Sequence, residues 1–243
     1  MEKNKYPKIL VGGPVSDHHD YCYLQFLETV KRLSYPNFDV FFVDNSKDEK
    51  FYNKIKKDFP NTERIQYNEN VKIRLAESRN LARKKVLDEG YDYLFCIDQD
   101  VIAPPDIIQR LLAHGKEIVT GIYYNNFTKF NSLTNEYEQR KLPVVWVKSL
   151  KDENRLVSIR KEVIESGELI RIDSCGTGCI LIHRSVLEKI KFRWEDDKPG
   201  VDDVFFCIDA LKSGYEIYAD TSIICEHLVD GRPIAWGKGD MKT

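Results

Sequence analysis

The chain has 243 residues, of which 42% are hydrophobic and 31% are charged, a balance typical of a globular domain. Its 37 basic and 39 acidic residues nearly cancel, which gives no electrostatic basis for nucleic-acid binding. No apolar run approaches the ~18 residues that a membrane helix needs, and the polar start "MEKNKYPKIL" does not resemble a signal peptide. We therefore expect a cytoplasmic protein, or one that is peripheral to a membrane.

The six cysteines show no paired spacing. Cys96, Cys207 and Cys225 lie inside apolar runs, where a thiol behaves as a small hydrophobe. Cys175 and Cys179 are close enough to suggest metal ligands, but no second pair accompanies them. We predict reduced core cysteines, which fits a reducing compartment.

Strands and helices alternate along the first half of the sequence. The predicted elements, in chain order, are strand 8–13, helix 21–33, strand 38–46, helix 53–59, strand 64–68, helix 74–89, strand 93–97, helix 105–113 and strand 117–124. This order predicts a mostly parallel sheet with helices on both faces. Ligands bind such sheets beyond the carboxyl ends of the strands, so polar residues at those ends are candidates for a site.

The second half is less regular. Residues 125–167 are polar and weakly periodic, which predicts loops and short strands facing a substrate. From 168 to 190 the pattern predicts a strand, a Gly-Thr-Gly turn, a second strand and a helix. A helix at 203–212 and two short strands up to 228 follow. The tail from 229 to 243 is glycine-rich, and we expect it to be mobile.

Two carboxylates, Asp98 and Asp100, follow the buried strand 93–97 directly. On an extended segment they would project to the same side and repel each other unless a cation lies near them. Their oxygen ligands suit Mg²⁺ or Mn²⁺. The simpler alternative is an acidic turn in which an aspartate caps helix 105–113. An EF-hand loop is excluded, because neither the third ligand nor the glycine follows at the required spacing.

Five stretches of the chain, found in order, carry a family resemblance. They are "VDNSKD" (43–48), "ESRNLARKKVLDEGYDYLFCIDQD" (77–100), "GTGCILIHRSVLEKI" (176–190), "VDDVFFCIDALKSGYEIYAD" (201–220) and "SIICEH" (222–227). Over about residues 8 to 228 the chain resembles nucleotide-sugar-dependent glycosyltransferases of the GT-A fold, close to the inverting family 2.

The resemblance implies an α/β fold in a single GT-A domain, residues 1–243. Its Rossmann-like nucleotide-sugar-binding half, about 1–124, would contain the mostly parallel central sheet. A smaller half with a mixed sheet, 125–228, would face the acceptor. The acceptor itself, whether a glycan, a lipid-linked molecule or a protein, is not carried over, because residues 125–167 match nothing in the family.

The implied activity is metal-dependent transfer of a sugar from a nucleotide-diphosphate donor to an acceptor hydroxyl with inversion, UDP-sugars being the favoured donors. The implied cofactor is Mn²⁺ or Mg²⁺. The residues predicted to bind the nucleotide are Pro14, Val15, Asp44, Arg79 and Asp98. Those predicted on the donor-sugar side are Gly176, Thr177 and Gly178. Asp100 and His227 are predicted to ligate the metal directly. Asp98, also assigned to the metal site, is predicted to contact the ribose or a metal-bound water.

In the family the aspartate of a Glu-Asp motif is the catalytic base, and the motif here is Asp202-Asp203. The resemblance therefore assigns the base to Asp203, with Asp202 as the less favoured alternative. Either aspartate would also cap helix 203–212, and a helix N-terminus lowers a carboxylate's pKa. Arg79 would contact the diphosphate, brace Asp44 or simply face solvent. The remaining histidines, His18, His19, His114 and His183, are interpreted as surface or loop residues.

Three other functions compete. The Asp-x-Asp also resembles that of haloacid-dehalogenase-like phosphatases, which need it on the first strand, whereas three strands precede it here. A sugar nucleotidyltransferase normally has a basic glycine-rich loop after strand one, and "VGGPVSDHH" (11–19) lacks the basic residue. A non-catalytic GT-A scaffold that binds nucleotide sugars or glycans is disfavoured by the joint presence of Asp98, Asp100, Asp203 and His227.

Overall fold

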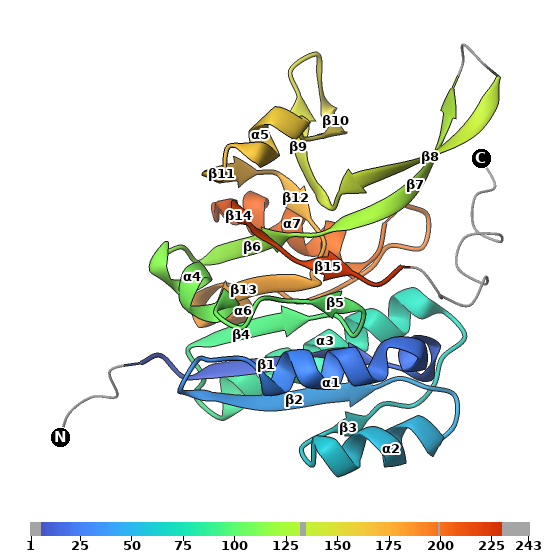
Figure 1. Ribbon diagram of the computed structural model, residues 1–243, viewed down its shortest axis with the longest axis vertical. Helices are drawn as coiled ribbons and strands as arrows, with labels where there is room; N and C mark the ends of the chain where they lie inside the picture. The colour runs from blue at the N-terminus through green and yellow to red at the C-terminus, as the bar shows by residue number, and fades with distance from the viewer. Residues whose placement is uncertain (1–5, 132–134, 199, 230–243) are drawn as a thin grey trace.

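The structure is a computed structural model that describes residues 6–131, 135–198 and 200–229. Its centre is an eight-stranded sheet in the order β11-β14-β6-β13-β4-β1-β2-β3 (Figure 1). The strands are β1 Ile9–Val15, β2 Phe38–Asp44, β3 Glu63–Arg64, β4 Tyr93–Ile97, β6 Ile118–Ile122, β11 Leu169–Ile172, β13 Cys179–His183 and β14 Ile217–Ile224. The pairs β1–β2, β1–β4, β2–β3 and β6–β14 are parallel. Strand β13 is antiparallel to both β4 and β6, and β11 to β14, so the predicted mostly parallel sheet is confirmed.

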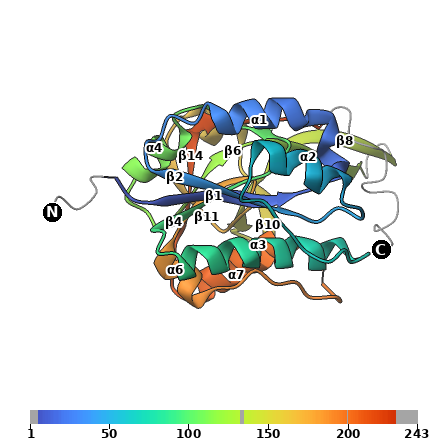
Figure 2. The same cartoon turned by 90° about the horizontal axis from the view of Figure 1, so that it is seen from below.

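Helices cover both faces of this sheet, as predicted. They are η1 Asp17–Cys22, α1 Tyr23–Lys31, α2 Lys50–Asp58, α3 Val71–Asp88, α4 Ile107–Ala113, α5 Lys161–Glu165, α6 Arg184–Lys189 and α7 Asp202–Lys212. Figure 2 shows α1, α2 and α4 on one face and α3, α6 and α7 on the other. The strands are therefore buried on both sides, which explains why they read as continuous apolar runs in the sequence.

Alternate strand residues enter two separate cores. In β1, Leu10 joins the core under α3, whereas Ile9 and Val11 join the core under α1. In β2, Phe41 and Phe42 divide in the same way. This follows from the two-residue period of a strand, because successive side chains point to opposite faces.

Helix α3 supplies several residues to the site described below. It begins earlier than predicted, because Asn70 caps it by accepting a backbone hydrogen bond. Within the predicted helix 74–89, Ser78, Ala82 and Val86 are buried against the sheet. The helix ends just before Gly90, whose φ of 73° is readily adopted only by glycine.

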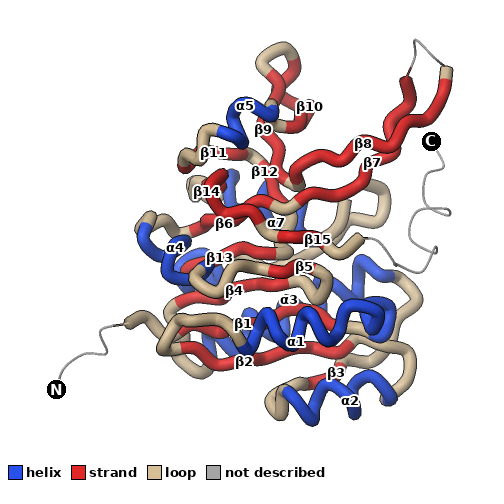
Figure 3. The backbone as a smooth tube through the Cα atoms, viewed as in Figure 1, coloured by secondary structure: helices blue, strands red, loops and turns tan. Residues whose placement is uncertain are grey.

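Residues 125–167 are more ordered than the predicted loops and short strands. Strands β7 Tyr124–Asn131 and β8 Glu136–Pro143 form a long hairpin that projects from the body of the molecule (Figure 3). Strands β9 Val145–Ser149 and β10 Asp152–Ser158 pair with each other, and β12 Ser174–Cys175 joins them in a small sheet. The hairpin pairs polar residues such as Asn126 with Lys141, so it lacks the apolar alternation by which strands are recognised.

Strands from both predicted halves share the central sheet, since β11, β13 and β14 complete it beside β4 and β6. All six cysteines are buried free thiols, as predicted for core residues. Among the described residues no helix is long and apolar enough to cross a membrane. Nearly all of the predicted mobile tail, residues 230–243, lies outside the described part of the chain.

Candidate active site

A cavity of about 270 Å³ lies at the carboxyl ends of β1, β2 and β4. Nine of the predicted site residues line it, namely Pro14, Val15, Arg79, Asp98, Asp100, Thr177, Asp202, Asp203 and His227. Three others, Asp44, Gly176 and Gly178, are not in its wall. The topology explains the convergence, because parallel strands end at the same edge of the sheet and their loops meet there.

Asp98 and Asp100 do not lie on an extended segment, which the expectation of a shared direction assumed. The backbone leaves the extended conformation after Ile97, and a turn forms in which the amide of Val101 donates to the carbonyl of Asp98 (3.0 Å). Asp98 then accepts from Nη2 of Arg79 at 2.7 Å. Asp100 faces two imidazoles instead. Each carboxylate therefore has its own cationic or donor partners, which relieves the repulsion that we expected between Asp98 and Asp100.

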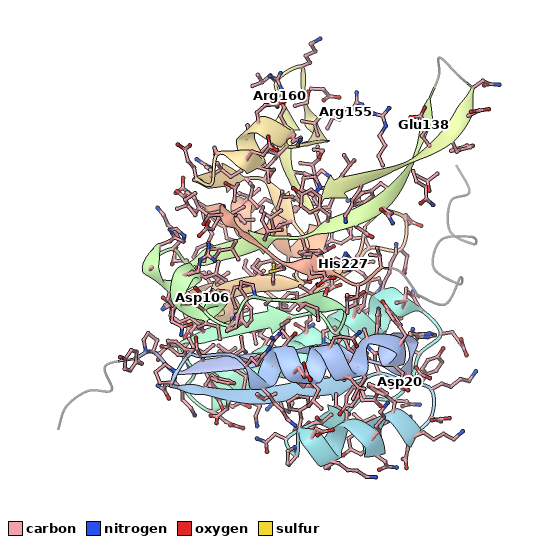
Figure 4. All side chains as sticks on the ribbon, viewed as in Figure 1. Asp20, Asp106, Glu138, Arg155, Arg160 and His227 are labelled. Atoms are coloured by element: carbon pink, nitrogen blue, oxygen red, sulfur yellow. The ribbon has the colours of Figure 1, made fainter. Side chains whose placement is uncertain are left out.

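Asp100 is 3% exposed and lies between two histidines from distant parts of the chain. Its Oδ2 is 3.3 Å from Nε2 of His227 and 3.4 Å from Nε2 of His19. Strand β15 (Glu226–His227) brings His227 there by pairing with β5 (Val101–Ile102), at the boundary between the upper and lower parts of the molecule (Figure 4). Burial alone would raise the pKa of Asp100, but the imidazoles outweigh it and hold the pKa well below its usual range.

The donor set around Asp100 fits a divalent cation. Nδ1 of His227 lies 2.7 Å from the carbonyl oxygen of Tyr124, which can only accept, so Nδ1 carries a proton. Nε2 of His227, 3.3 Å from Oδ2 of Asp100, then carries either a second proton or a lone pair, and with a lone pair two acceptors would face each other. A proton or a metal ion must lie between them, and a carbonyl behind the imidazole is the usual support of a metal-ligating histidine. The described residues contain no group of three or more such side chains that would hold an ion by itself.

The residue between the two aspartates, Gln99, fastens the loop after β1 to this turn. Its Oε1 accepts from the amide of Ser16 and its Nε2 donates to the carbonyl of His19, both at 2.9 Å. This clamp places His19, which we expected to be a surface or loop histidine, in the cavity wall beside Asp100. One signal was present: His19 follows the carboxyl end of the first strand, where ligands bind in such sheets.

Arg79 joins two carboxylates from different elements. Its Nη2 donates to Asp98 at 2.7 Å and its Nη1 to Asp202 at 3.1 Å, and the residue is 3% exposed. Burial alone would lower the pKa of Arg79, but Asp202 and Asp98 outweigh it and hold the pKa above its ordinary value. The expected brace between Arg79 and Asp44 is not formed, because Asp44 has another partner.

Asp44 is fully buried at the end of β2, outside the cavity wall. Its Oδ1 accepts from the hydroxyl of Ser46 at 2.6 Å, and its Oδ2 lies 3.3 Å from Nε of Arg64. Burial raises the pKa of Asp44, although Ser46 and Arg64 oppose the rise. Its neighbour Asn45 lines the cavity in its place.

Neither Asp202 nor Asp203 caps α7. The N-cap is Val201, and the aspartates are the first two helical residues. Asp202 is 1% exposed and paired with Arg79, whereas the half-buried Asp203 lines the cavity. Burial and the nearby charge of Asp202 raise the pKa of Asp203 to about 7, although Arg79 opposes the rise. The expectation of a lowered pKa at the helix N-terminus is therefore wrong, because burial and the charge of Asp202 raise it.

The Gly-Thr-Gly turn packs against a residue that the sequence did not single out, Tyr123. A Cβ on Gly176 would lie 2.0 Å from the Tyr123 hydroxyl oxygen, and one on Gly178 would lie 2.9 Å from Cζ of the same ring. The ring of Tyr123 stands edge-on to His227, with centroids 5.1 Å apart. The glycines therefore leave room for Tyr123, while Thr177 between them lines the cavity.

Arg74 is a second missed residue. It lines the cavity from the first turns of α3 and is 5% exposed. Its guanidinium lies 4.7 Å from the ring centroid of Tyr67 and donates to the carbonyls of Asn68 and Glu69. Within the described part of the chain no carboxylate forms an ion pair with it. Its position five residues before Arg79 on the same predicted helix was the available signal.

A mixed α/β fold that gathers carboxylates, imidazoles and a guanidinium at the carboxyl ends of its strands is the arrangement of a GT-A transferase. The family model described as glycosyl transferase family 2 matches residues 23–191, which is more than half of the chain. The chain therefore belongs to glycosyl transferase family 2 and is a glycosyltransferase.

A solved structure, that of TarS, shares the fold at low sequence identity. S. aureus TarS 1-349 is 14% identical with a TM-score of 0.53, and the match covers 90% of this chain and 60% of that one. The chain thus spans less than two thirds of TarS 1-349. A197 from STIV is 17% identical over 92% of this chain and 86% of its own length, with a TM-score of 0.48. A comparison with curated proteins found no match.

Proposed function

We propose that this glycosyltransferase uses a divalent cation, Mn²⁺ or Mg²⁺, to transfer a sugar from a UDP-sugar to an acceptor hydroxyl with inversion. The observation that supports this most is the convergence of Asp98, Asp100, Asp203 and His227 on one cavity of about 270 Å³. These residues come from three separate parts of the sequence. Membership of the family supplies the reaction class, a transfer from a nucleotide-sugar donor.

Asp100 and His227 would hold the cation, with Asp98 nearby for ribose or a metal-bound water. When bound, the cation neutralises the charge that grows on the leaving diphosphate. The described residues offer two direct ligands rather than a complete cage, which suits Mg²⁺ or Mn²⁺, because these ions keep positions for phosphate oxygens and water. Arg74, which forms no ion pair with a carboxylate of the described chain, is the guanidinium that we assign to the nucleotide diphosphate.

Asp203 would accept the proton of the acceptor hydroxyl. A pKa of about 7 suits this role, since a general base works best when its pKa lies near the operating pH. Attack guided by this carboxylate from the face opposite the diphosphate would invert the configuration at the sugar carbon. Pro14, Val15 and Asn45 line the cavity at the ends of β1 and β2, where we place the nucleotide.

Thermal unfolding with a panel of UDP-, GDP- and other nucleotide sugars, each with and without Mn²⁺, tests the proposal. We expect one UDP-sugar to raise stability by ~2–4 kcal/mol at saturating ligand, and to do so only with Mn²⁺. Stabilisation by guanosine donors alone would contradict the proposal that the donor nucleotide is UDP. Equal stabilisation without the metal would contradict the proposed role of the cation in donor binding.

A further inference from the structure

Arg79 contacts the two carboxylate motifs of the site at the same time. Asp98 belongs to the turn after β4, and Asp202 belongs to the first turn of α7. Separate nitrogens of one guanidinium reach them, Nη2 to Asp98 at 2.7 Å and Nη1 to Asp202 at 3.1 Å. Arg79, in the middle of α3, therefore connects the predicted donor side of the cavity to the helical turn that carries the predicted base.

Loss of the ion pair between Arg79 and Asp202 would be energetically costly. Asp202 is 1% exposed, its Oδ1 has no hydrogen-bond partner in the described structure, and Arg79 supplies the ion pair to its Oδ2. Removing one member of a buried ion pair leaves an uncompensated charge and is strongly destabilising. Without Arg79, Asp202 would have to bind a proton, or the first turn of α7 would have to move so that the carboxylate could reach water.

Arg79 is poorly placed to bind the donor diphosphate. It is 3% exposed, and both of its terminal nitrogens already donate to carboxylates. The two carboxylates also offset its positive charge, which weakens its attraction for a phosphate. Arg74 lines the same cavity without a carboxylate partner in the described chain, so the site has a better candidate for that role.

We propose that Arg79 is a positioning residue for Asp203. By holding Asp202 and Asp98 on one guanidinium, it fixes the first turn of α7 against the turn after β4, and so directs the neighbouring Asp203 into the cavity. This inference rests on the proposed role of Asp203 as the base. It assigns Arg79 no contact with substrate.

The shape of the guanidinium is essential to this role. A guanidinium presents several N–H donors in a fixed plane and can serve two carboxylates at once, whereas a lysine ammonium is a compact charge at the end of a flexible chain. Arg79→Lys therefore keeps the charge but loses one of the two links. Arg83, one turn further along α3, offers a matched control. Its Nε donates to the backbone carbonyls of Leu187 and Ile190, outside the cavity wall.

The experiment compares the full-length Arg79→Lys and Arg83→Lys variants. It measures kcat and donor KM from UDP release, and measures affinity for UDP with Mn²⁺ by calorimetry. We expect Arg79→Lys to lower kcat by about 10- to 100-fold, because a displacement of about 1 Å at a catalytic group has this effect. We expect its UDP affinity and donor KM to stay within about threefold of wild type. Arg83→Lys should retain the kcat of the wild type.

A double-mutant cycle with Asp202→Ala, which removes the acceptor for Arg79, tests the link itself. If Arg79 acts through Asp202, the double variant should lose little more kcat than Arg79→Lys alone, because residues that act as a unit are not additive. Fully additive losses would overturn the proposal. So would a loss of UDP affinity beyond about tenfold with unchanged kcat, which would make Arg79 a diphosphate ligand.

Asp203→Asn, assayed in parallel, separates this inference from the proposed function. Wild-type turnover by Asp203→Asn would overturn the base assignment, and the positioning role with it. An inactive Asp203→Asn beside a fully active Arg79→Lys would overturn the positioning role alone.

Discussion

His227 and Asp100 meet across the short β5–β15 ladder, with Nε2 of the histidine 3.3 Å from Oδ2 of the aspartate. The amide of Leu228 also donates to the carbonyl of Asp100 at 2.8 Å. The backbone therefore holds the late strand against the turn that follows β4. This ladder turns two residues from distant parts of the sequence into a paired donor set that fits a divalent cation.

Removal of divalent metal should abolish turnover. We expect excess EDTA to stop UDP release, and added Mn²⁺ or Mg²⁺ to restore it. Asp100→Ala and His227→Ala should each weaken Mn²⁺-dependent UDP binding, measured by calorimetry, by about 10- to 100-fold. His114→Ala serves as the control, because His114 pairs with Asp220 away from the cavity and should leave this binding unchanged. Full activity in EDTA would remove the metal role from Asp98, Asp100 and His227 together.

Asp203→Asn should retain UDP and metal binding but lower transfer by ~10²–10⁴-fold, since asparagine cannot take the proton. Asp202→Asn should cost much less, because its amide oxygen can still accept from Arg79. Initial rates and calorimetry of the two variants test this difference. The product of the wild type should have inverted configuration by NMR. A larger loss from Asp202→Asn, or a retained product, would contradict the assignment of the base.

Activity should depend on pH near neutrality. A base whose pKa is about 7 must be ionised to act, so kcat/KM should fall as pH decreases through about 7. A pH–rate profile from 5 to 9 in a constant-ionic-strength buffer measures this limb. A rate that stays constant down to about pH 5 would contradict a raised pKa for the catalytic base.

The same pKa shift predicts how stability depends on pH. The folded-state pKa of Asp203, about 7, exceeds its ordinary value of 3.8, so the folded state binds the proton more tightly than the unfolded state. The contribution of this group to stability is therefore fully present below the unfolded pKa and is lost as pH rises to about 7. Asp203→Asn should melt above the wild type at pH 8, and this advantage should disappear near pH 4. Equal melting temperatures at pH 8 would contradict the raised pKa.

Two neighbouring residues should affect nucleotide binding differently. Asp44→Ala should raise the donor KM more than it lowers kcat, and should also lower the Tm, because it removes the buried partner of Ser46 and Arg64. Asn45→Ala should raise the donor KM with a smaller change in Tm, since Asn45 lines the cavity. Steady-state kinetics and thermal unfolding of both variants distinguish the roles. An unchanged donor KM in both variants would show that other residues recognise the nucleotide.

The amino-acid sequence by itself determined the fold class and the region of the site. Apolar runs such as 93–97 and the stripe of α3 report burial within one element, and the aspartates at 98 and 100 mark the end of a strand. These are local properties, because each depends on the period of a strand or helix. The late motifs at 203 and 227 were identified through the family resemblance rather than by local physics.

The tertiary structure alone decided which charges meet. Arg79 could have braced Asp44 or faced solvent, but the packing of α3 between β4 and α7 joins it to Asp98 and Asp202. The clamp of Gln99 brings His19 to Asp100 in the same way. A contact between distant residues, and the burial that sets a pKa, depend on the path of the whole chain. Sequence periodicity carries no information about that path, which is why the raised pKa of Asp203 emerged only from the folded structure.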